Sequence, residues 1–293
     1  MKLLSSHFAS GLLGALVSTA LFSLTSMQAP FVVQSGSLGA PMGLGANSTL
    51  LGQQEILRTM SLVDLPDGNG GTVRTLRIEG VNVQIVNGLG ATNGAPMSPN
   101  SLDPATTTVD GTGNLIIGYN EAQTGTELRT GSHNLIVGHQ NAYESFGGIV
   151  AGGACRIATP YSSVTGGRFN LAEANYASVS GGRFNTASGA HSCVTGGELN
   201  NAVGARSAVG GGSLNVAGGE AASVSGGDEN MASGRFAAVS GGSENEASGE
   251  GSCVTGGQLN AAFGLYGMVS GGSANITVGD RNWRGGECLL CSN

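Results

Sequence analysis

One spacing governs the middle and the end of this 293-residue sequence, because the same short pattern recurs every 15 residues. The pattern sets a valine, a Gly-Gly pair and an asparagine at fixed places in eight successive units. Self-similarity at a fixed period indicates a repeat architecture, so the period constrains the fold before any local structure does. The repeating residues are Val164, Val179, Val194, Val209, Val224, Val239, Val254 and Val269, with Asn170, Asn185, Asn200, Asn215, Asn230, Asn245, Asn260 and Asn275.

The consensus S-V-S/T-G-G-x-x-N-x-A-x-G-x-x-x favours extended structure, because valine, paired glycines and asparagine are poor helix formers. In a strand S-V-S/T-G, the valine points to one face and the two hydroxyl residues point to the other. Asparagine and glycine tolerate left-handed backbone, so we expect both residue types at corners. The predicted fold class is therefore all-β, with each unit forming one coil of a parallel β-solenoid and the coils stacked about 4.8 Å apart.

Weaker copies of the pattern lie upstream, beginning at Leu115, Leu135 and Val150. They extend the predicted repeat domain to residues 113–279 and give it about eleven coils, in a rod roughly 50 Å long. Leu115 and Leu135 are 20 residues apart, five more than the repeat requires. We expect the extra residues to form a loop around residues 124–130.

The chain start is typical of an exported protein. Lys2 precedes an apolar stretch that is shorter than the roughly 20 residues needed to span a bilayer, so residues 1–29 are predicted to be a signal peptide or an N-terminal anchor. No later segment of the sequence has the apolar length of a transmembrane helix. The predicted location is therefore secreted or on the cell surface.

Two further segments flank the predicted rod. Residues 30–112 are expected to contain a short helix over 48–60, a small β cap over 73–87 interrupted at Gly80, and a Gly/Pro-rich linker. Residues 280–293 form a predicted C-terminal cap or tail.

Composition bears on partners and on assembly. The chain has 53 glycines and a formal net charge of −7, so it repels phosphate backbones and nucleic acid is not an expected partner. Ordering one coil costs on the order of 15 kcal/mol of backbone entropy, whereas one buried valine and one alanine return only a few. So thin a core predicts that hydrogen bonds between coils contribute heavily and that one face is buried in an oligomer.

The run A-S-V-S-G-G-x-x-N-x-A-S-G, found at 177–189 and 222–234, resembles the head repeats of YadA-like trimeric autotransporter adhesins. It is most similar to the fifteen-residue variant found in uncharacterised exported bacterial proteins, where an N-L-I-V-G-x-x-N segment like Asn134 to Asn141 precedes the repeats. The resemblance implies a left-handed β-roll, three copies of which associate side by side as a homotrimer. It also implies a role in attachment to host or environmental surfaces.

The two variable positions before each asparagine define a candidate partner-binding or trimer-interface column, because residues 15 apart stack in a solenoid. One interpretation is a receptor patch with arginine and aromatic anchors, facing a surface protein or a glycan. The favoured alternative is that positions 169, 184, 199, 214 and 259 face neighbouring subunits. The candidate residues are Arg168, Phe169, Arg183, Phe184, Leu199, Leu214, Glu229 and Glu244.

Catalytic, cofactor and metal sites are not expected. Stacked Glu229 and Glu244 would hold their carboxylates near 5 Å apart, which suits a retaining glycosidase or part of a calcium site. A solvated acidic strip is the favoured interpretation, and a polysaccharide-acting enzyme is the least favoured function. Cys193 and Cys253 share one column four coils apart, roughly 19 Å, too far for a disulfide.

A phage-fibre-like or ice-binding rod is the remaining alternative, because flat rows of hydroxyls can order water. Cys288 and Cys291 form a C-x-x-C pair without a second pair for zinc. The hydroxyl rows include Ser163, Thr165, Ser178, Ser180, Ser223 and Ser225, and they are interrupted at Ala208, Gly210, Ala238 and Met268.

Overall fold

A computed structural model describes residues 47–123 and 128–286. The predicted signal peptide or anchor, most of the predicted loop around 124–130, and the C-x-x-C pair lie outside the described residues. The chain divides into two compact units, Met1–Val81 and Asn82–Asn293.

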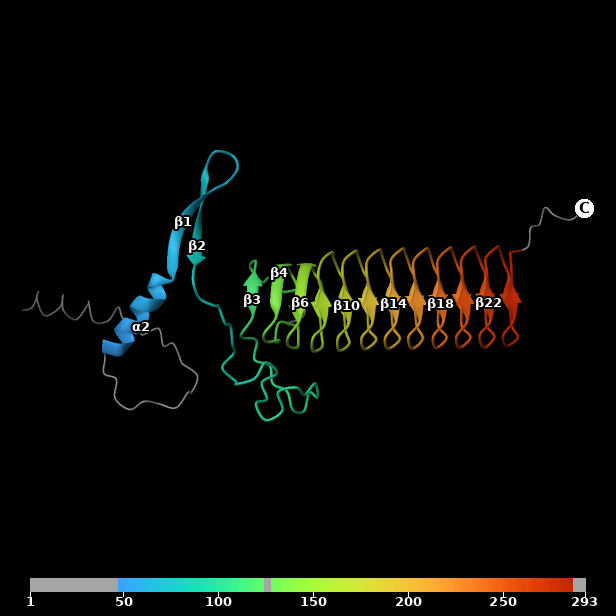
Figure 1. The fold of residues 1–293 in the computed structure, drawn as a ribbon, viewed down its shortest axis with the longest axis horizontal. Helices are drawn as coiled ribbons and strands as arrows, with labels where there is room; N and C mark the ends of the chain where they lie inside the picture. The colour runs from blue at the N-terminus through green and yellow to red at the C-terminus, as the bar shows by residue number, and fades with distance from the viewer. Residues whose placement is uncertain (1–46, 124–127, 287–293) are drawn as a thin grey trace, which may run out of the picture. The chain divides into compact units, whose positions relative to one another are not determined.

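The second unit contains a parallel β-solenoid whose coils stack into a rod (Figure 1). Its larger sheet has 12 strands and its smaller sheet has 10. The larger sheet consists of β3 (Leu115–Ile117), β4 (Leu135–His139), β6 (Ile149–Gly153), β8 (Ser163–Val164), β10 (Ser178–Val179), β12 (Cys193–Val194), β14 (Ala208–Val209), β16 (Ser223–Val224), β18 (Ala238–Val239), β20 (Cys253–Val254), β22 (Met268–Val269) and β24 (Trp283–Arg284).

The smaller sheet runs along the same rod. It consists of β5 (Ala142–Tyr143), β7 (Arg156–Ile157), β9 (Leu171–Ala172), β11 (Thr186–Ala187), β13 (Asn201–Ala202), β15 (Val216–Ala217), β17 (Met231–Ala232), β19 (Glu246–Ala247), β21 (Ala261–Ala262) and β23 (Ile276–Thr277). Coils with a strand in both sheets therefore number about ten, while β3 and β24 add strands to the larger sheet alone. The larger sheet continues past residue 279, where the predicted repeat ends.

The register confirms that residues one period apart stack. Val179 pairs with Val164 on one side and with Val194 on the other. Leu115 pairs with Leu135, so the longer interval upstream is absorbed without a change of register. The sequence period therefore converts directly into columns of side chains along the rod.

Each coil buries a valine from the larger sheet and an alanine from the smaller one, as the strand pattern predicts. Val179 and Ala187 are fully buried, while Ser178 is half-buried and Ser180 is exposed. The core cluster extends from Ile136 to Val269 as a single narrow line of such residues.

The predicted place of the asparagines at left-handed corners is wrong. None of the eight repeat asparagines has a positive φ; the residue before each one does, as in Phe169 (57°) and Glu244 (56°). The asparagines are buried instead. The physical reason is that the inside of the corner needs hydrogen-bond partners, and an amide side chain supplies both a donor and an acceptor.

These asparagines form a continuous polar column inside the rod. Asn215 donates from Nδ2 to the carbonyl oxygens of Gly211 at 2.9 Å and Gly227 at 2.8 Å. Its Oδ1 accepts the backbone N–H of Asn230 at 3.0 Å. The same three bonds recur from coil to coil, so the column ties each coil to the next where the apolar core is thin.

A column of small buried residues offers a test of packing. Ser192, Ser207 and Ser252 are buried with no hydrogen-bond partner for their hydroxyls, and Ala222 fills the same place in another coil. We expect Ser207→Ala to stabilise the rod by about 1 kcal/mol, because a buried hydroxyl without a partner loses its hydration without compensation.

Chemical denaturation monitored by circular dichroism measures this change. The matched control is Ser162→Ala, which removes a hydroxyl that donates to the carbonyl oxygen of Thr159 at 2.7 Å and should destabilise the rod. Equal effects of the two substitutions would contradict the expectation.

The first unit contains helix α2 (Asn47–Arg58) and an antiparallel hairpin of β1 (Met60–Pro66) and β2 (Thr72–Ile78). The helix matches the segment predicted from the sequence. The predicted strands over 73–87 are only half right, because residues 81–87 form no strand and β2 pairs with β1 instead. Over the residues that the structure describes, no helix is long and apolar enough to cross a membrane.

Candidate functional site: the outward columns of the rod

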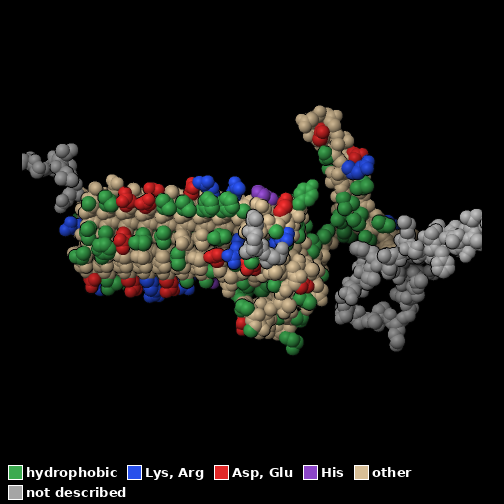
Figure 2. Space-filling model, turned by 180° about the vertical axis from the view of Figure 1, so that it is seen from behind, with side chains coloured by type: hydrophobic (Ala, Val, Ile, Leu, Met, Phe, Trp, Pro, Cys, Tyr) green, Lys and Arg blue, Asp and Glu red, His purple; other side chains and the backbone are tan. Residues whose placement is uncertain are grey.

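The candidate column occupies one corner of the rod, at the two positions before each buried asparagine. We call it the corner column, from Arg168 and Phe169 to Gln258 and Leu259. Backbone bridges join Arg168 to Arg183 and then continue at every coil, so the predicted side chains lie in one continuous row. Figure 2 shows hydrophobic and charged side chains gathered in rows that run along the rod.

The first two coils of the corner column present arginine and phenylalanine together. The rings of Phe169 and Phe184 stack with centroids 4.8 Å apart. The guanidinium carbon of Arg168 lies 4.6 Å from the Phe169 centroid, and Arg183 lies 5.3 Å from that of Phe184. These contacts cover ring faces and leave ring edges and guanidinium groups outward, and cation–π pairing at such exposed sites contributes about 0.5–1 kcal/mol.

The rest of the corner column changes character along the rod. Leu199, Leu214 and Leu259 are 42–49% exposed and give it an apolar stretch on either side of an acidic one. Glu229 and Glu244 are exposed in the acidic stretch. The column therefore runs from cationic and aromatic through apolar to acidic, which suits recognition of a partner by position.

The acidic stretch does not resemble an acid/base pair. A retaining glycosidase needs one of its two carboxyls in an environment that raises its pKa. Glu229 and Glu244 instead both lie on the outside of a corner, in solvent. Among residues 47–123 and 128–286, no group of three His, Cys, Asp or Glu side chains is placed to hold a metal ion.

A second outward column was missed by the sequence analysis. Tyr161, Tyr176 and His191 stack face to face, with centroids 5.5 Å and 4.8 Å apart. Next to their continuation, Glu220 pairs with Arg206 and with Arg235. The signal was present as the same 15-residue spacing, at positions where the residue type varies from coil to coil.

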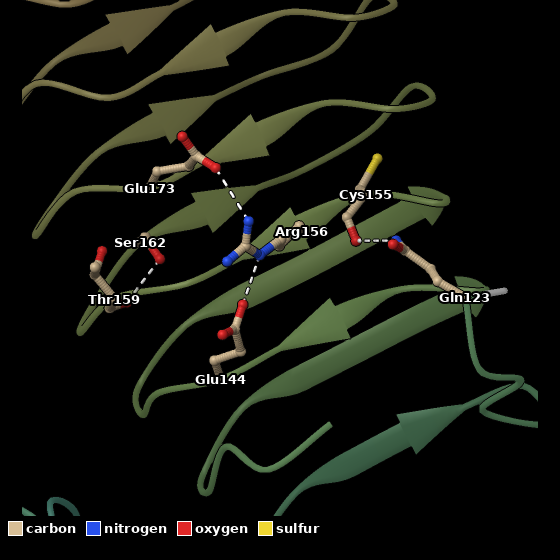
Figure 3. Close-up of polar contacts among 7 residues, drawn as sticks. All are labelled: Gln123, Glu144, Cys155, Arg156, Thr159, Ser162 and Glu173. Carbon is tan, nitrogen blue, oxygen red and sulfur yellow. Dashed lines mark hydrogen bonds and ion pairs between the residues drawn. The ribbon is translucent and has the colours of Figure 1, made fainter. Parts of the chain in front are cut away.

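An ion-pair cluster on the smaller sheet joins three successive coils (Figure 3). The Arg156 Nε lies 2.5 Å from Glu144 Oε1, and its Nη1 lies 3.1 Å from Glu173 Oε1. The hydrogen bond from Arg156 to Glu144 raises the pKa of the guanidinium, and the negative charges of Glu144 and Glu173 act in the same direction. All three side chains are partly buried, so the cluster serves to hold coils together.

Cys155 occupies the place of an asparagine in the buried polar column (Figure 3). Its backbone N–H donates to Asn141 Oδ1 at 3.1 Å, as a column asparagine would do. Burial raises the pKa of its thiol. Cys193 and Cys253 are free thiols, as their predicted separation requires.

The hydroxyl rows are partly engaged by the protein itself. Ser163 pairs with Ser178 in register, as predicted. Thr165 Oγ1, however, donates to the carbonyl oxygen of Ser180 at 3.1 Å. A hydroxyl bonded to backbone is less free to order water, which argues against the ice-binding alternative.

Comparison with known proteins does not extend these observations. No protein-family model matches the chain, and no significantly similar curated protein was found. The structure therefore establishes a parallel β-solenoid with a 15-residue repeat, and the likeness to adhesin head repeats rests on the sequence motif alone.

Proposed function

We propose that this chain is an exported, non-enzymatic structural rod that displays columns of side chains for attachment to a surface protein or a glycan. The observation that supports the proposal is the corner column, which holds exposed arginine, aromatic and leucine side chains in register on a hydrogen-bonded scaffold. Arginine and aromatic residues are the types enriched among binding hot spots.

The ligand chemistry follows from the first two coils of that column. Arg168 and Arg183 turn guanidinium groups outward beside stacked rings, and the rings prearrange them at low entropic cost. Carboxylates fit this arrangement best, so the ligand class is an acidic glycan or an acidic protein segment.

The proposal includes a homotrimer, as the motif resemblance implies. Leu199, Leu214 and Leu259 on the corner column are exposed large apolar side chains, which supports contact with neighbouring copies there. In such an assembly the apolar stretch of the column would be covered, and the arginine and phenylalanine stretch would remain for the ligand.

Binding of the full chain to immobilised acidic glycans and acidic peptides tests the display function. We expect Arg168→Ser combined with Arg183→Ser to weaken binding about tenfold or more, because a charge-assisted hydrogen bond is lost at each position. We also expect binding to weaken with added salt.

The matched control alters charge in the same column: Glu229→Ser combined with Glu244→Ser should leave binding intact or strengthen it. Binding that is equal in the arginine variant and the wild type, or absent from the wild type, would contradict the display function.

A further inference from the structure

The N-terminal helix and hairpin form secondary structure without a core. From residue 52 to residue 81 no side chain is buried, and the hydrophobic core cluster of the chain begins only at Ile136. A two-stranded hairpin is marginal in water by itself, and a helix as short as α2 is marginal too. Something outside this unit must therefore cover it.

Both faces of the hairpin are apolar. The register pairs Met60 with Ile78 and Leu62 with Leu76. Directly opposed residues of an antiparallel pair point to the same side, so these four residues make one face, which we call face A.

The opposite side of the hairpin is face B. On it Leu65 pairs with Val73, and Val63 pairs with Thr75. Strand alternation turns these side chains away from face A. A single flat partner could cover only one of the two faces.

The amount of uncovered apolar surface is that of an interface. Seven large apolar side chains in α2 and the hairpin are 37–68% exposed: Ile56, Leu57, Leu62, Leu65, Val73, Leu76 and Ile78. Together they expose on the order of 600 Å² of apolar surface, close to the roughly 800 Å² that each partner contributes to a standard protein interface.

The charges around this surface are mixed in sign. Arg74 and Asp64 form an ion pair, with Nε and Oδ1 3.7 Å apart, at the end of face A. A polybasic membrane-binding segment would have one sign only. Neighbouring Asp and Arg instead complement the same pair on another copy.

We propose that this hairpin joins copies of the chain head to tail, with face A of one copy covering face B of the next. Two different faces on one element call for a heterologous contact, and such contacts close into a ring when the rotation allows. Three copies form the smallest ring that covers every face in this way. The inference rests on the homotrimer of the proposed function and assigns its contact to residues 60–78.

The experiment measures the mass of the full chain by light scattering for the wild type and two variants. Leu62→Glu places a charge on face A, and Val73→Glu places one on face B. Each variant should fall from the mass of three chains to that of one, because a head-to-tail ring needs both faces. Asn69→Glu, in the hairpin turn, is the control and should keep the wild-type mass.

Mixing the two variants at high concentration gives the sharper result. A Leu62→Glu chain retains face B and a Val73→Glu chain retains face A, so the mixture should form pairs containing one of each. Restored pairing also shows that both variants still fold in this region.

Several results would overturn the inference. If both variants keep a three-chain mass, the contact lies elsewhere although the homotrimer stands. If only one variant loses association, or if the mixture forms no pairs, the contact is not head to tail. A wild type with the mass of one chain removes the homotrimer itself, while the display function is judged separately by ligand binding.

Discussion

Replacing Asn215 by leucine is expected to destabilise the rod by about 3–5 kcal/mol, although the two side chains are similar in size. The substitution leaves the carbonyl oxygens of Gly211 and Gly227 and the backbone N–H of Asn230 without the partners they have now. Each unpaired buried group costs about 1–3 kcal/mol, and that sum is a large part of the stability of a typical protein. Urea denaturation followed by circular dichroism measures the loss.

The end of the column supplies a graded comparison. The Asn275 amide donates to the carbonyl oxygen of Gly271 at 3.0 Å, and Asn275 lies in the last full repeat of the column. Asn275→Leu should therefore cost only about 1 kcal/mol, the value of a single hydrogen bond. A loss at Asn275 as large as that at Asn215 would mean that the column does not act through its hydrogen bonds.

A surface substitution in the same coil completes the comparison. Ser213 is half-exposed, and its backbone N–H donates to Gly227 whatever its side chain is. Ser213→Ala should change stability by no more than about 0.5 kcal/mol.

The importance of Asn215 also marks a limit of inference from sequence. The period, the buried valine and alanine and the outward hydroxyls could all be predicted, because they follow from strand alternation and from stacking at constant spacing. The role of asparagine could not, because local propensity places it at left-handed corners. Its actual role appears only when coil-to-coil carbonyl groups such as that of Gly227 are in place.

Irregular spacing hid a second feature. Val150 and Val164 are 14 residues apart, so one residue is missing in that coil, and counting by 15 does not align Cys155 with Asn170. The backbone does align them, because Arg156 donates to the carbonyl oxygen of Asn170, and Ala142 donates to that of Cys155. A column inferred from sequence is thus reliable only where the period is constant.

The hairpin error had a local cause. Gly80 was interpreted as the break between two strands, whereas the turn is the D-G-N-G-G segment at 67–71. The Asp67 carboxylate accepts the backbone N–H groups of Asn69 and Gly71, both at 2.8 Å. Aspartate and glycine in this arrangement are a strong turn signal that points to β1 as the partner of β2.

The candidate column was predictable for the same reason as the core. Arg168 over Arg183 and Phe169 over Phe184 follow from the period alone, and the structure places them so. What the period does not give is how neighbouring side chains engage one another, such as the arginine over each ring. Those contacts depend on the left-handed backbone at Phe169 and Phe184, which turns each ring along the rod.

The paired glycines provide the second large expected effect, because two adjacent residues of one type should respond in opposite ways. A Cβ added to Gly212 would lie 2.1 Å from the carbonyl oxygen of Gly227 and 2.7 Å from Asn215 Nδ2, at a φ of +82°. A Cβ added to Gly211 would meet nothing within 4 Å, and the backbone there is outside the left-handed region.

We therefore expect Gly212→Ala to destabilise the rod by about 3–5 kcal/mol, through backbone strain together with the clash against the next coil. Gly211→Ala should have no effect or stabilise the rod by up to about 1 kcal/mol. The two variants have the same composition and nearly the same unfolded chain, so the difference between their denaturation midpoints reports the folded state alone. Similar midpoints would mean that the coils are not in the close contact from which the columns, and hence the displayed surface, are built.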